Sequence, residues 1–471
     1  MPFENTYTQL PDICYSRVIA ARVPRPRLLA WNQPLAEELG LVDLGGDAEQ
    51  LAQWFSGNTP LPGSEPIALA YAGHQFGNFV PQLGDGRAVL LGEVRAGDGR
   101  RYDIQLKGSG PTPYSRQGDG KAALGPVLRE YLVSEAMHRL GIPTTRALAM
   151  VATGERVYRE QPLPGAVLTR VAASHIRIGT FEYLAARNDK TALQALVELA
   201  IERHYPAVSE AERPVVGLFR EVVRAQARLV AQWMSVGFIH GVMNTDNVAI
   251  SGQTLDYGPC AFMDAFDYHQ VFSSIDRMGR YAYGRQPQIQ HWNLARLAEA
   301  LLPLGDPPEV FEEALGEFPS LFEEAFRTAM GHKLGLAVVR KEDEALINAW
   351  LQLLQDEQRD FTLSFRQLAE RLEGEGEPLF GEFESGWRKR VLDQGLDAAT
   401  VRRNMDAVNP LYIPRNHLVE RAIEAAMAGD LSVFQELEEV LQNPFVEQPG
   451  KAELARPPSP EEMVIQTFCG T

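Results

Sequence analysis

The chain has 471 residues, 45% hydrophobic and 23% charged, which is typical of a globular protein with room for two or three domains. Its formal net charge of −17 argues against nucleic acid or an anionic membrane as the main partner, because both favour basic surfaces. No apolar run approaches the roughly 18 residues of a membrane span, and the N-terminal stretch lacks an apolar signal core, so we expect a cytoplasmic protein. The cysteines Cys14, Cys260 and Cys469 form no CxxC pair, which argues against a structural zinc site and a disulfide framework.

The first 180 residues carry the signals of a β-rich domain. Four apolar runs predict strands: 88–94, 101–107, 145–152 and 165–172. The first two flank the turn-forming sequence AGDG, which predicts a hairpin. Helical spacing predicts helices over 27–41 and 122–141, the second closed by Gly141 and Pro143. A hairpin, a helix and further strands are typical of the small lobe of a protein kinase.

After residue 190 the chain becomes mostly helical. Apolar faces predict helices over 218–238, 292–305 and 343–354, and the last 30 residues predict an irregular tail. We therefore expect five parts: an N-terminal extension (1–60), a kinase-like N-lobe (61–180), a kinase-like C-lobe core (181–285), a helical C-terminal region (286–445) and an irregular tail ending in Cys469 (446–471).

The sequence QLGDGR carries a glycine pair before a predicted strand. Gly84 and Gly86 would let backbone amides approach a phosphate, and Arg87 adds positive charge. A plain hairpin turn is the alternative, and the motif in isolation favours it.

Lys107 ends the second predicted strand. In protein kinases a strand lysine binds nucleotide phosphates and pairs with a glutamate of the next helix. The helix predicted over 122–141 offers Glu130 and Glu135, and their spacing does not choose between them. A surface lysine at a strand end is the alternative.

The sequence RQGDGKAALG puts Gly118, Asp119, Gly120 and Lys121 at the expected entrance of that helix. Amide donors and the dipole at a helix start favour an anion. An aspartate N-cap with a flexible turn explains the same residues equally well.

Five cations could converge on one cleft of this acidic protein: Arg87, Lys107, Lys121, Arg170 and Arg177. Transfer of a γ-phosphoryl group leaves ADP, whereas attack at the α-phosphorus expels pyrophosphate, which is compact and highly charged. Cations held deep in a site stabilise such a leaving group. The number of cations therefore suits a triphosphate tail buried inward, with the α-phosphate facing outward.

The octapeptide HGVMNTDN (240–247) is the strongest local signal. A kinase catalytic loop reads His-Arg-Asp, four residues, then a metal-binding Asn. Asn247 takes the Asn position, and Asp256 of DYG stands where kinases carry Asp-Phe-Gly. Hard oxygen ligands suit magnesium, so we expect both to bind it, with short strands at 248–250 and 254–255 between them. An Asn-Asp turn feeding a hairpin, with a structural aspartate, is the alternative.

The usual catalytic aspartate is missing from this loop. Counting back five from Asn247 reaches Val242, which cannot accept a proton, and Asp246 is the only carboxylate of the octapeptide. Asp246 could approach a hydroxyl from another direction if the nucleotide is bound in another orientation. Three functions stay open: AMP transfer, γ-phosphoryl transfer with Asp246 as substitute base, and a catalytically inactive nucleotide-binding scaffold. The presence of Lys107, Asn247 and Asp256 weighs against the scaffold.

Four long stretches make the chain resemble the selenoprotein O family, kinase-fold proteins that transfer AMP to protein hydroxyls. They are YAGHQFGNFVPQLGDGRA (71–88), DIQLKGSGPTPYSRQGDGKAALGPVLREYLVSEAMHRLGIPTTRAL (103–148), GFIHGVMNTDNVAISGQTLDYGP (237–259) and NPLYIPRNH (409–417). The resemblance covers nearly the whole chain. The ending TFCGT matches the cysteine-containing, bacterial-type members, which carry cysteine where others carry selenocysteine.

The resemblance implies a role for individual residues. It implies Glu130 as the partner of Lys107, Asp246 as the catalytic base, and Asn247 and Asp256 as magnesium ligands. It implies ATP bound in a flipped orientation relative to protein kinases. Contacts to the nucleotide are implied for Gly84, Gly86, Arg87, Lys107, Asp119, Gly120, Arg170, Arg177 and Asp256. In some members the terminal cysteine pairs with one in the activation segment, so a reversible disulfide between Cys260 and Cys469 is a hypothesis, beside two unrelated thiols.

We therefore expect an α+β, protein-kinase-like two-lobed fold, with a small β-rich N-lobe, a large mostly helical C-lobe and helical extensions. The expected reaction is transfer of AMP from ATP to Ser, Thr or Tyr hydroxyls of proteins, with release of pyrophosphate. Mg²⁺, or Mn²⁺ in its place, is the expected cofactor. Lys121 joins the nucleotide-binding set on charge and position alone.

Overall fold

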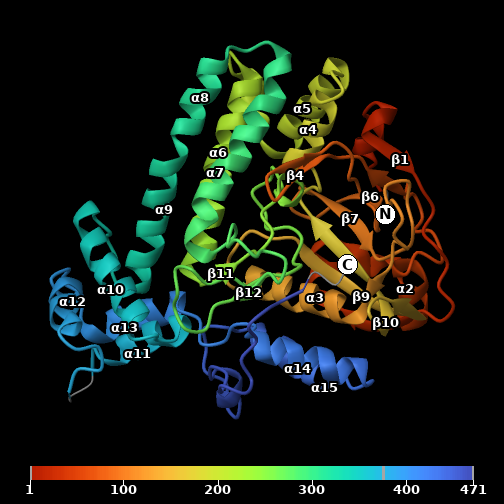
Figure 1. Ribbon diagram of the computed structural model, residues 1–471. Coiled ribbons are helices and arrows are strands. Elements are labelled where there is room, and N and C mark those ends of the chain that lie inside the picture. Colours follow the sequence, from red (N-terminus) through yellow and green to blue (C-terminus); the bar gives the residue numbers. More distant parts are fainter. Residues whose placement is uncertain (1–2, 374–376, 469–471) are drawn as a thin grey trace.

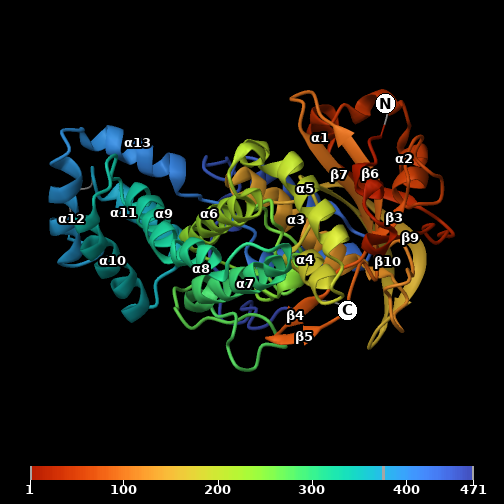
Figure 2. The ribbon, with the colours of Figure 1, turned by 90° about the horizontal axis from the view of Figure 1, so that it is seen from above.

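The computed structural model describes residues 3–373 and 377–468. A sheet-containing part, built mainly from the first 172 residues, lies beside a larger helical part (Figure 1). Helices α10 to α13 lie at the end of the molecule farthest from the sheet, as both ribbon views show (Figures 1 and 2). None of the helices within the described ranges is both long enough and apolar enough to cross a membrane.

The sheet is antiparallel and has eight strands, in the order β1-β3-β6-β7-β10-β9-β2, with β8 paired to β10. The strands are β1 (Tyr15–Arg17), β2 (Arg27–Trp31), β3 (Ile67–Leu69), β6 (Ala88–Arg95), β7 (Arg101–Lys107), β8 (Ala122–Ala123), β9 (Arg146–Tyr158) and β10 (Pro162–Ala172). The four strands predicted from apolar runs are therefore confirmed as β6, β7, β9 and β10. The predicted hairpin joins β6 and β7, and a second hairpin joins β9 and β10.

The predicted helix over 27–41 is wrong in its first half. Residues Arg27–Trp31 form β2, which pairs with β9, and only α1 (Gln33–Glu38) is helical. Asn32 separates the two, because its side chain accepts a hydrogen bond from the backbone N of Leu35 and caps the helix. Pairing with β9 at the sheet edge thus overrides the local helical pattern.

Helices cover both faces of the sheet. One face packs on α1 and α2 (Ala48–Phe55), with Val89, Leu106 and Val167 in the shared core. The other face packs on α3 (Leu124–Arg139), which α14 (Asn416–Met427) and α15 (Ser432–Leu441) cover from behind. Alternation of side chains along each strand supplies apolar residues to both faces.

The helical part follows β10, and several of its helices begin with proline in the first turn, a position that needs no backbone N–H. Its helices are α4 (Ile178–Ala185), α5 (Lys190–His204), α6 (Pro214–Ser235), α7 (Gln286–Leu301), α8 (Pro308–Gly316), α9 (Phe318–Lys333), α10 (Glu344–Asp356), α11 (Phe361–Glu370), α12 (Phe383–Leu392) and α13 (Ala398–Val408). The helices predicted at 218–238, 292–305 and 343–354 are confirmed as α6, α7 and α10. The tail after α15 contains one short 3-10 helix, Ala452–Leu454, and is otherwise irregular over the part described, as predicted.

The loops between α6 and α7 hold two small β elements. The strands β11 (Phe238–Ile239) and β12 (Ala261–Phe262) pair with each other around the predicted metal-binding segment. The short strands predicted at 248–250 and 254–255 are wrong. Ala249 bridges to Arg177 and Thr254 bridges to Thr144, so each run pairs with a distant segment instead of with the other.

Candidate active site

A cavity of about 790 Å³ lies between the sheet-containing part and the loops that follow α6. Its volume is in the range usual for small-molecule sites. The structure brings together in its lining nearly all of the residues that the sequence singled out: Gly84, Gly86, Arg87, Lys107, Asp119, Gly120, Lys121, Arg170, Arg177, Asp246, Asn247 and Asp256. Five segments far apart in the sequence therefore meet at one place.

A group of five charged residues forms the inner charge cluster of this cavity: Lys107, Glu130, Arg170, Arg177 and Asp256. Lys107 and Gln105 lie two residues apart on β7, and Arg170 of β10 is the register partner of Gln105, so all three share one face of the sheet. Lys107 Nζ lies 2.5 Å from Glu130 Oε2 on α3 and 3.9 Å from Asp256 Oδ1.

The two candidate glutamates of α3 have different partners. Glu130 accepts hydrogen bonds from both Lys107 and Arg170. Glu135 lies in another contact set, where Arg146 donates to it at 2.7 and 2.9 Å and Asn32 at 2.8 Å. The structure thus makes the choice that spacing left open.

Three cations and two carboxylates share the inner charge cluster and shift one another's pKa values. Arg170 and Arg177 each donate to Asp256 and, although burial opposes this, hold the pKa of that carboxyl well below its ordinary value. Glu130 has its pKa lowered by Arg170 and Lys107, again against the effect of burial. Burial, helped by Arg170, lowers the pKa of Lys107 to about 8.

Arg177 connects Asp256 to the octapeptide. It directly precedes α4, and its Nη1 donates both to Asp256 Oδ2 and, at 2.6 Å, to the backbone O of Asp246. Its guanidinium also lies 4.7 Å from the centroid of the Tyr71 ring. One side chain therefore fixes the candidate base and the candidate metal ligand relative to each other.

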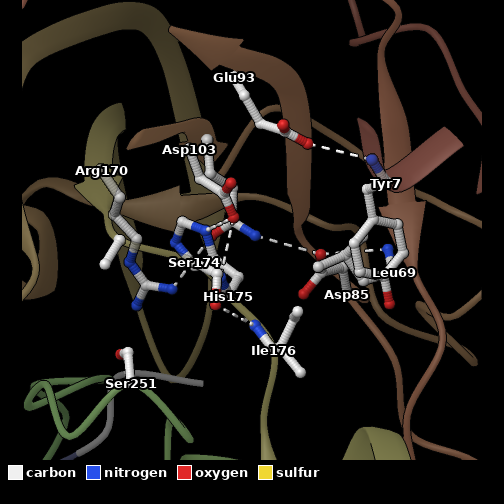
Figure 3. A network of polar contacts seen from close by, with 12 residues as sticks. Tyr7, Leu69, Asp85, Glu93, Asp103, Arg170, Ser174, His175, Ile176 and Ser251 are labelled. Atoms are coloured by element: carbon white, nitrogen blue, oxygen red, sulfur yellow. Dashed lines mark hydrogen bonds and ion pairs between the residues drawn. The ribbon is translucent and has the colours of Figure 1, made fainter. Parts of the chain in front are cut away.

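A buried polar network supports the cluster from within the sheet (Figure 3). Arg170 Nη1 donates to Gln105 Oε1 at 3.4 Å, and Gln105 Nε2 donates to Asp85 Oδ2 at 3.1 Å. Leu69 N also donates to Asp85 Oδ2, at 3.2 Å, and burial raises the pKa of Asp85. A separate set of buried contacts involves Asp103, which lies 2.8 and 2.9 Å from the backbone N and Nδ1 of His175.

The octapeptide follows α6 as a buried loop. His240 is buried, with Nε2 at 2.9 Å from the backbone O of Leu255, which ties the loop to the segment that carries Asp256. Thr245–Asn247 form a 3-10 turn. Val242 is buried and lines the cavity, so the position of the usual kinase base is apolar here.

Asp246 is the titratable group of this loop that lines the cavity. It is 7% exposed, and burial raises its pKa to about 6. Gln75 Nε2 donates to its Oδ2 at 3.4 Å, whereas Oδ1 has no hydrogen-bond partner among the described residues. Oδ1 is itself buried, and a buried carboxylate with a raised pKa is suited to accept a proton from a hydroxyl.

Asn247 and Asp256 fit the requirements of a magnesium site. The side-chain nitrogen of Asn247 donates to the backbone O of Val242 at 3.0 Å, which leaves Oδ1 as the atom that can bind a cation. Asp256 is an ionised carboxylate, and both residues line the same cavity. Two hard protein oxygens, completed by phosphate oxygens and water, are typical of magnesium bound with a nucleotide. The described residues contain no cluster of three or more His, Cys, Asp or Glu that could hold a metal without such a partner.

The glycines of the cavity allow a close approach of two chain segments. A Cβ at Gly84 would collide with the ring of Tyr114, and one at Gly120, which has a φ of +66°, would collide with the backbone of Gly110. The backbone N of Gly86 donates to the backbone O of Gly84 at 2.8 Å, so this amide is engaged within the turn. Gly84 and Gly86 thus admit the 112–115 segment, and the Gly86 amide is not turned to a phosphate.

An outer charge cluster lies at the edge of the cavity: Asp119, Lys121, Glu155 and Arg159. Lys121 Nζ lies 2.9 Å from Glu155 Oε2, and Arg159 Nη1 lies 3.0 Å from Asp119 Oδ2. The predicted position of Gly118, Asp119, Gly120 and Lys121 at the entrance of α3 is wrong, because β8 comes between Lys121 and the first helical residue, Leu124. Asp119 instead accepts a hydrogen bond from the backbone N of Lys121, which closes a turn.

Of the two cysteines in the disulfide hypothesis, only Cys260 is described. Cys260 is buried, four residues after Asp256, whereas Cys469 lies outside the described residues. The preceding part of the tail does reach this segment, since Thr467 Oγ1 donates to the backbone O of Pro259 at 2.6 Å.

Several cavity residues carried no recognised signal in the sequence. Gln75, Phe76 and Tyr114 line the cavity, as do Arg159 and Ile275. Gln75 and Phe76 lie in the stretch 71–88, which resembles the selenoprotein O family. The resemblance covered both residues but implied no role for either. Arg159 and Ile275 enter through long-range folding of the β9–β10 hairpin and of the loop before α7, which local patterns do not reveal.

Comparisons with known proteins agree with this geometry. The family model of protein adenylyltransferase SelO matches residues 1–442. A protein nucleotidyltransferase YdiU of Bradyrhizobium diazoefficiens is 55% identical, over all of this chain and 99% of the relative. Proteins of the same name from Rhizobium meliloti and Agrobacterium fabrum are 54% and 51% identical, over all of this chain and 99% and 100% of the relatives.

Proposed function

The chain belongs to the protein adenylyltransferase SelO family and is a nucleotidyltransferase, and from this premise we propose that it transfers AMP from ATP to Ser, Thr or Tyr hydroxyls of proteins. The observation that carries the proposal is the pairing of a buried Asp246, whose pKa burial raises to about 6, and an apolar Val242 in the same cavity. If Asp246 activates the acceptor hydroxyl, the base does not occupy the usual kinase position. That arrangement suits a nucleotide whose α-phosphate faces the acceptor.

The architecture supports a kinase-like division into two lobes. We assign residues 61–180 to a small N-lobe and 181–285 to the core of a C-lobe, with the cavity between them. Residues 1–60, 286–445 and 446–471 are the N-terminal extension, the helical C-terminal region and the tail. The pair Lys107–Glu130 then corresponds to the strand lysine and helix glutamate of protein kinases.

The inner charge cluster is the proposed site of the β- and γ-phosphates. Lys107, Arg170 and Arg177 are cations on buried or nearly buried side chains, held in fixed directions by Glu130 and Asp256. Fixed cations stabilise charge that develops on a leaving group without reorganising during the reaction. Arg87, Asp119, Gly120 and Lys121 are the proposed contacts nearer the cavity edge.

The proposed step forms one bond and breaks one. The acceptor hydroxyl gives its proton to the Asp246 carboxylate, and its oxygen attacks the α-phosphorus of ATP. The bond between the α-phosphorus and the bridging oxygen to the β-phosphate breaks, and pyrophosphate leaves with that electron pair. Lys107, Arg170 and Arg177 hold the pyrophosphate, while Arg177 also fixes the backbone of Asp246.

Mg²⁺, or Mn²⁺ in its place, is the proposed cofactor, held by Asn247 and Asp256. When bound, the ion supplies neutralisation of phosphate charge. Asn247 Oδ1 and the Asp256 carboxylate are the protein atoms that orient it.

The reversible disulfide between Cys260 and Cys469 remains a proposal about access to the site. It draws support from the contact of Thr467 with Pro259, the neighbour of Cys260. Mass spectrometry of the oxidised, non-reduced protein should find this cross-link, and its absence would remove the proposal.

ATP labelled separately at the α- and γ-phosphates tests the function. Wild type, Asp246→Ala and Asp256→Ala are incubated with magnesium and a cell lysate as the source of acceptors. Label in protein from α-labelled ATP only, lost in both variants, is the expected result. Label from the γ position only would identify a kinase, and ATP binding without either label would identify an inactive scaffold.

A further inference from the structure

A small hairpin contacts the octapeptide residue by residue. Its strands are β4 (Gly73–Gln75) and β5 (Asn78–Val80), which pair antiparallel outside the main sheet. His74 N donates to Thr245 Oγ1 at 2.7 Å, and Phe76 N donates to the Asn244 side chain at 3.0 Å. Between them, the side chain of Gln75 reaches Asp246. Three consecutive hairpin residues therefore hold three consecutive loop residues.

The residues before Asp246 are fixed from a second side. Thr245 Oγ1 donates to Glu182 of α4 at 2.5 Å, and the His74 ring lies 2.5 Å from the same carboxylate. The hydroxyl of Tyr281 lies 2.5 Å from Asn244 Oδ1. Thr245 and Asn244 thus each bridge the hairpin to another element, so that the backbone entering Asp246 has little freedom to move.

The carboxylate of Asp246 lies between Gly73 and Gln75. A Cβ built at Gly73 would lie 2.5 Å from Asp246 Oδ1 and 2.8 Å from Asp246 Cβ, closer than side chains approach in proteins. Gln75 Nε2 donates to the opposite oxygen, Oδ2. Because position 73 has no side chain, the backbone of the hairpin can lie against Oδ1, which is buried and has no hydrogen-bond partner among the described residues, while the Gln75 amide donates to Oδ2.

From these contacts we propose that Gln75 is a positioning residue for the transfer reaction. It donates to Asp246 Oδ2 while Gly73 lies against the buried Oδ1, so that the orientation of the carboxylate is fixed, and the Gly73–Val80 hairpin clamps the loop in that orientation. This inference rests on the proposed function, because it assigns Gln75 a role through Asp246. Correct orientation of a base toward its hydroxyl contributes to the rate and not to nucleotide affinity.

Two variants of Gln75 and one of its strand neighbour test this role. Gln75→Glu keeps the length of the side chain but removes the amide donor, and Gln75→Ala removes both. Asn78→Ala is the matched control, since Asn78 is the register partner of Gln75 across the hairpin, is exposed and does not line the cavity. The readouts are kcat and KM with α-labelled ATP, the ATP affinity by calorimetry with Mn²⁺, and the melting temperature.

We expect kcat to fall about 10- to 100-fold in both Gln75 variants, as for misplacement of a catalytic group, while ATP affinity and melting temperature stay near wild type. Asn78→Ala should behave as wild type. Full kcat in Gln75→Glu would overturn the proposal, because the amide donor would then be dispensable. A parallel loss of kcat, ATP affinity and melting temperature would also overturn it, because it would indicate only a loosened hairpin.

A second variant approaches the same carboxylate from the other side. Gly73→Ala should displace Asp246 and lower kcat with ATP affinity retained. In the double variant with Gln75→Ala, the loss should be smaller than the product of the single losses, because both act on one group. If the two losses multiply, Gly73 and Gln75 do not act on the same carboxylate, and this part of the proposal is overturned.

The wild-type control separates this inference from the proposed function. If the wild type transfers only γ-label, AMP transfer fails, while the Gln75 variants still report on positioning through that label. A wild type that transfers neither label overturns both. Wild-type AMP transfer with unaffected Gln75 variants overturns only the role of Gln75.

Discussion

The cavity contains two charge clusters that are built differently. In the inner charge cluster the side chains of Glu130, Arg170 and Arg177 are 2 to 3% exposed, those of Lys107 and Asp256 are 11% and 21% exposed, and each carboxylate contacts more than one cation. In the outer charge cluster the side chains are 22 to 39% exposed and form two simple pairs, Lys121–Glu155 and Asp119–Arg159. Buried charges interact strongly and have fixed directions, whereas exposed pairs contribute little and rearrange readily. The inner cluster is therefore suited to transition-state stabilisation, and the outer cluster to weak guidance of the ligand.

Removing the charge of Asp256 should have the largest effect. Asp256→Asn retains the shape but weakens metal binding and unbalances Arg170 and Arg177, so AMP transfer should fall on the order of 10³-fold. Breaking a buried ion pair should also lower the free energy of unfolding by roughly 3 kcal/mol. Incorporation of α-label measures the loss of AMP transfer, and urea unfolding measures the loss in the free energy of unfolding. ATP affinity without metal should be retained, because the cations stay. Near-normal transfer would show that the inner cluster is not the reaction centre.

Replacing Arg177 by lysine should have the next largest effect. Lysine keeps the charge but lacks the planar guanidinium, whose Nη1 donates to both Asp256 and the backbone O of Asp246 and whose plane lies over the Tyr71 ring. We expect kcat to fall about 10- to 100-fold, as for loss of one charge-stabilising donor. Arg203→Lys is the matched control, because Arg203 is an equally buried arginine, 2% exposed, that contacts Asp103 and Glu93 outside the cavity. If Arg203→Lys lowers kcat as much as Arg177→Lys, burial and not position explains the loss.

Changes in the outer charge cluster should be small. Lys121→Ala removes an exposed pair with Glu155, so kcat should change less than about 3-fold, with a modest rise in the KM for ATP and no loss of stability. Lys190→Ala, an exposed lysine at the start of α5 and outside the cavity, is the control. A loss of kcat as large as that of Arg177→Lys would remove the distinction between the two clusters.

Lys333 provides the smallest expected effect on activity. It is 4% exposed, outside the cavity of Asp246, and burial lowers its pKa to about 7 from an ordinary 10.5. Its Nζ lies 4.2 Å from the centroid of the Phe365 ring. Lys333→Met should leave kcat unchanged. If Lys333→Met lost as much activity as the variants of the inner charge cluster, any buried cation would support activity, whatever its position.

The difference in stability between Lys333→Met and wild type should depend on pH. Between pH 7 and pH 10.5 the unfolded chain binds more protons than the folded chain, so wild-type stability should rise with pH across this window. Below pH 7 the lysine is charged in both states, and its burial costs the full amount. Lys333→Met should therefore be more stable than wild type by on the order of 5 kcal/mol at pH 6, and this gain should vanish toward pH 10.5. A gain that does not vary with pH would contradict a lowered pKa.

Much of the sheet and of the inner charge cluster could be predicted from local sequence. Apolar runs mark β6, β7, β9 and β10, and Lys107 and Asp256 lie in kinase-like motifs, whereas Arg170 lies in no local motif and is indicated only by its charge and by the family resemblance. The choice between Glu130 and Glu135 could not be made, because both lie on the buried side of α3 and only the fold decides which one meets Lys107.

The errors arise where long-range pairing decides the local structure. Residues 27–31 become a strand because β9 offers an edge, and 248–250 pairs with the segment before α4 instead of with its neighbour. Gln75 was missed for the same reason. Nothing in a short run of residues indicates that β4 lies against Thr245 and Asp246, 171 residues further along the chain.

The orientation of the bound nucleotide tests the central claim most directly. A crystal structure with Mn²⁺ and an ATP analogue that has a methylene between the α- and β-phosphates would locate each phosphorus, and anomalous scattering would locate the metal. We predict manganese bound by Asn247 and Asp256, the γ-phosphate against Lys107, Arg170 and Arg177, and the α-phosphorus nearest to Asp246. A γ-phosphate nearest to Asp246, with the α-phosphate against the inner charge cluster, would contradict AMP transfer from this site.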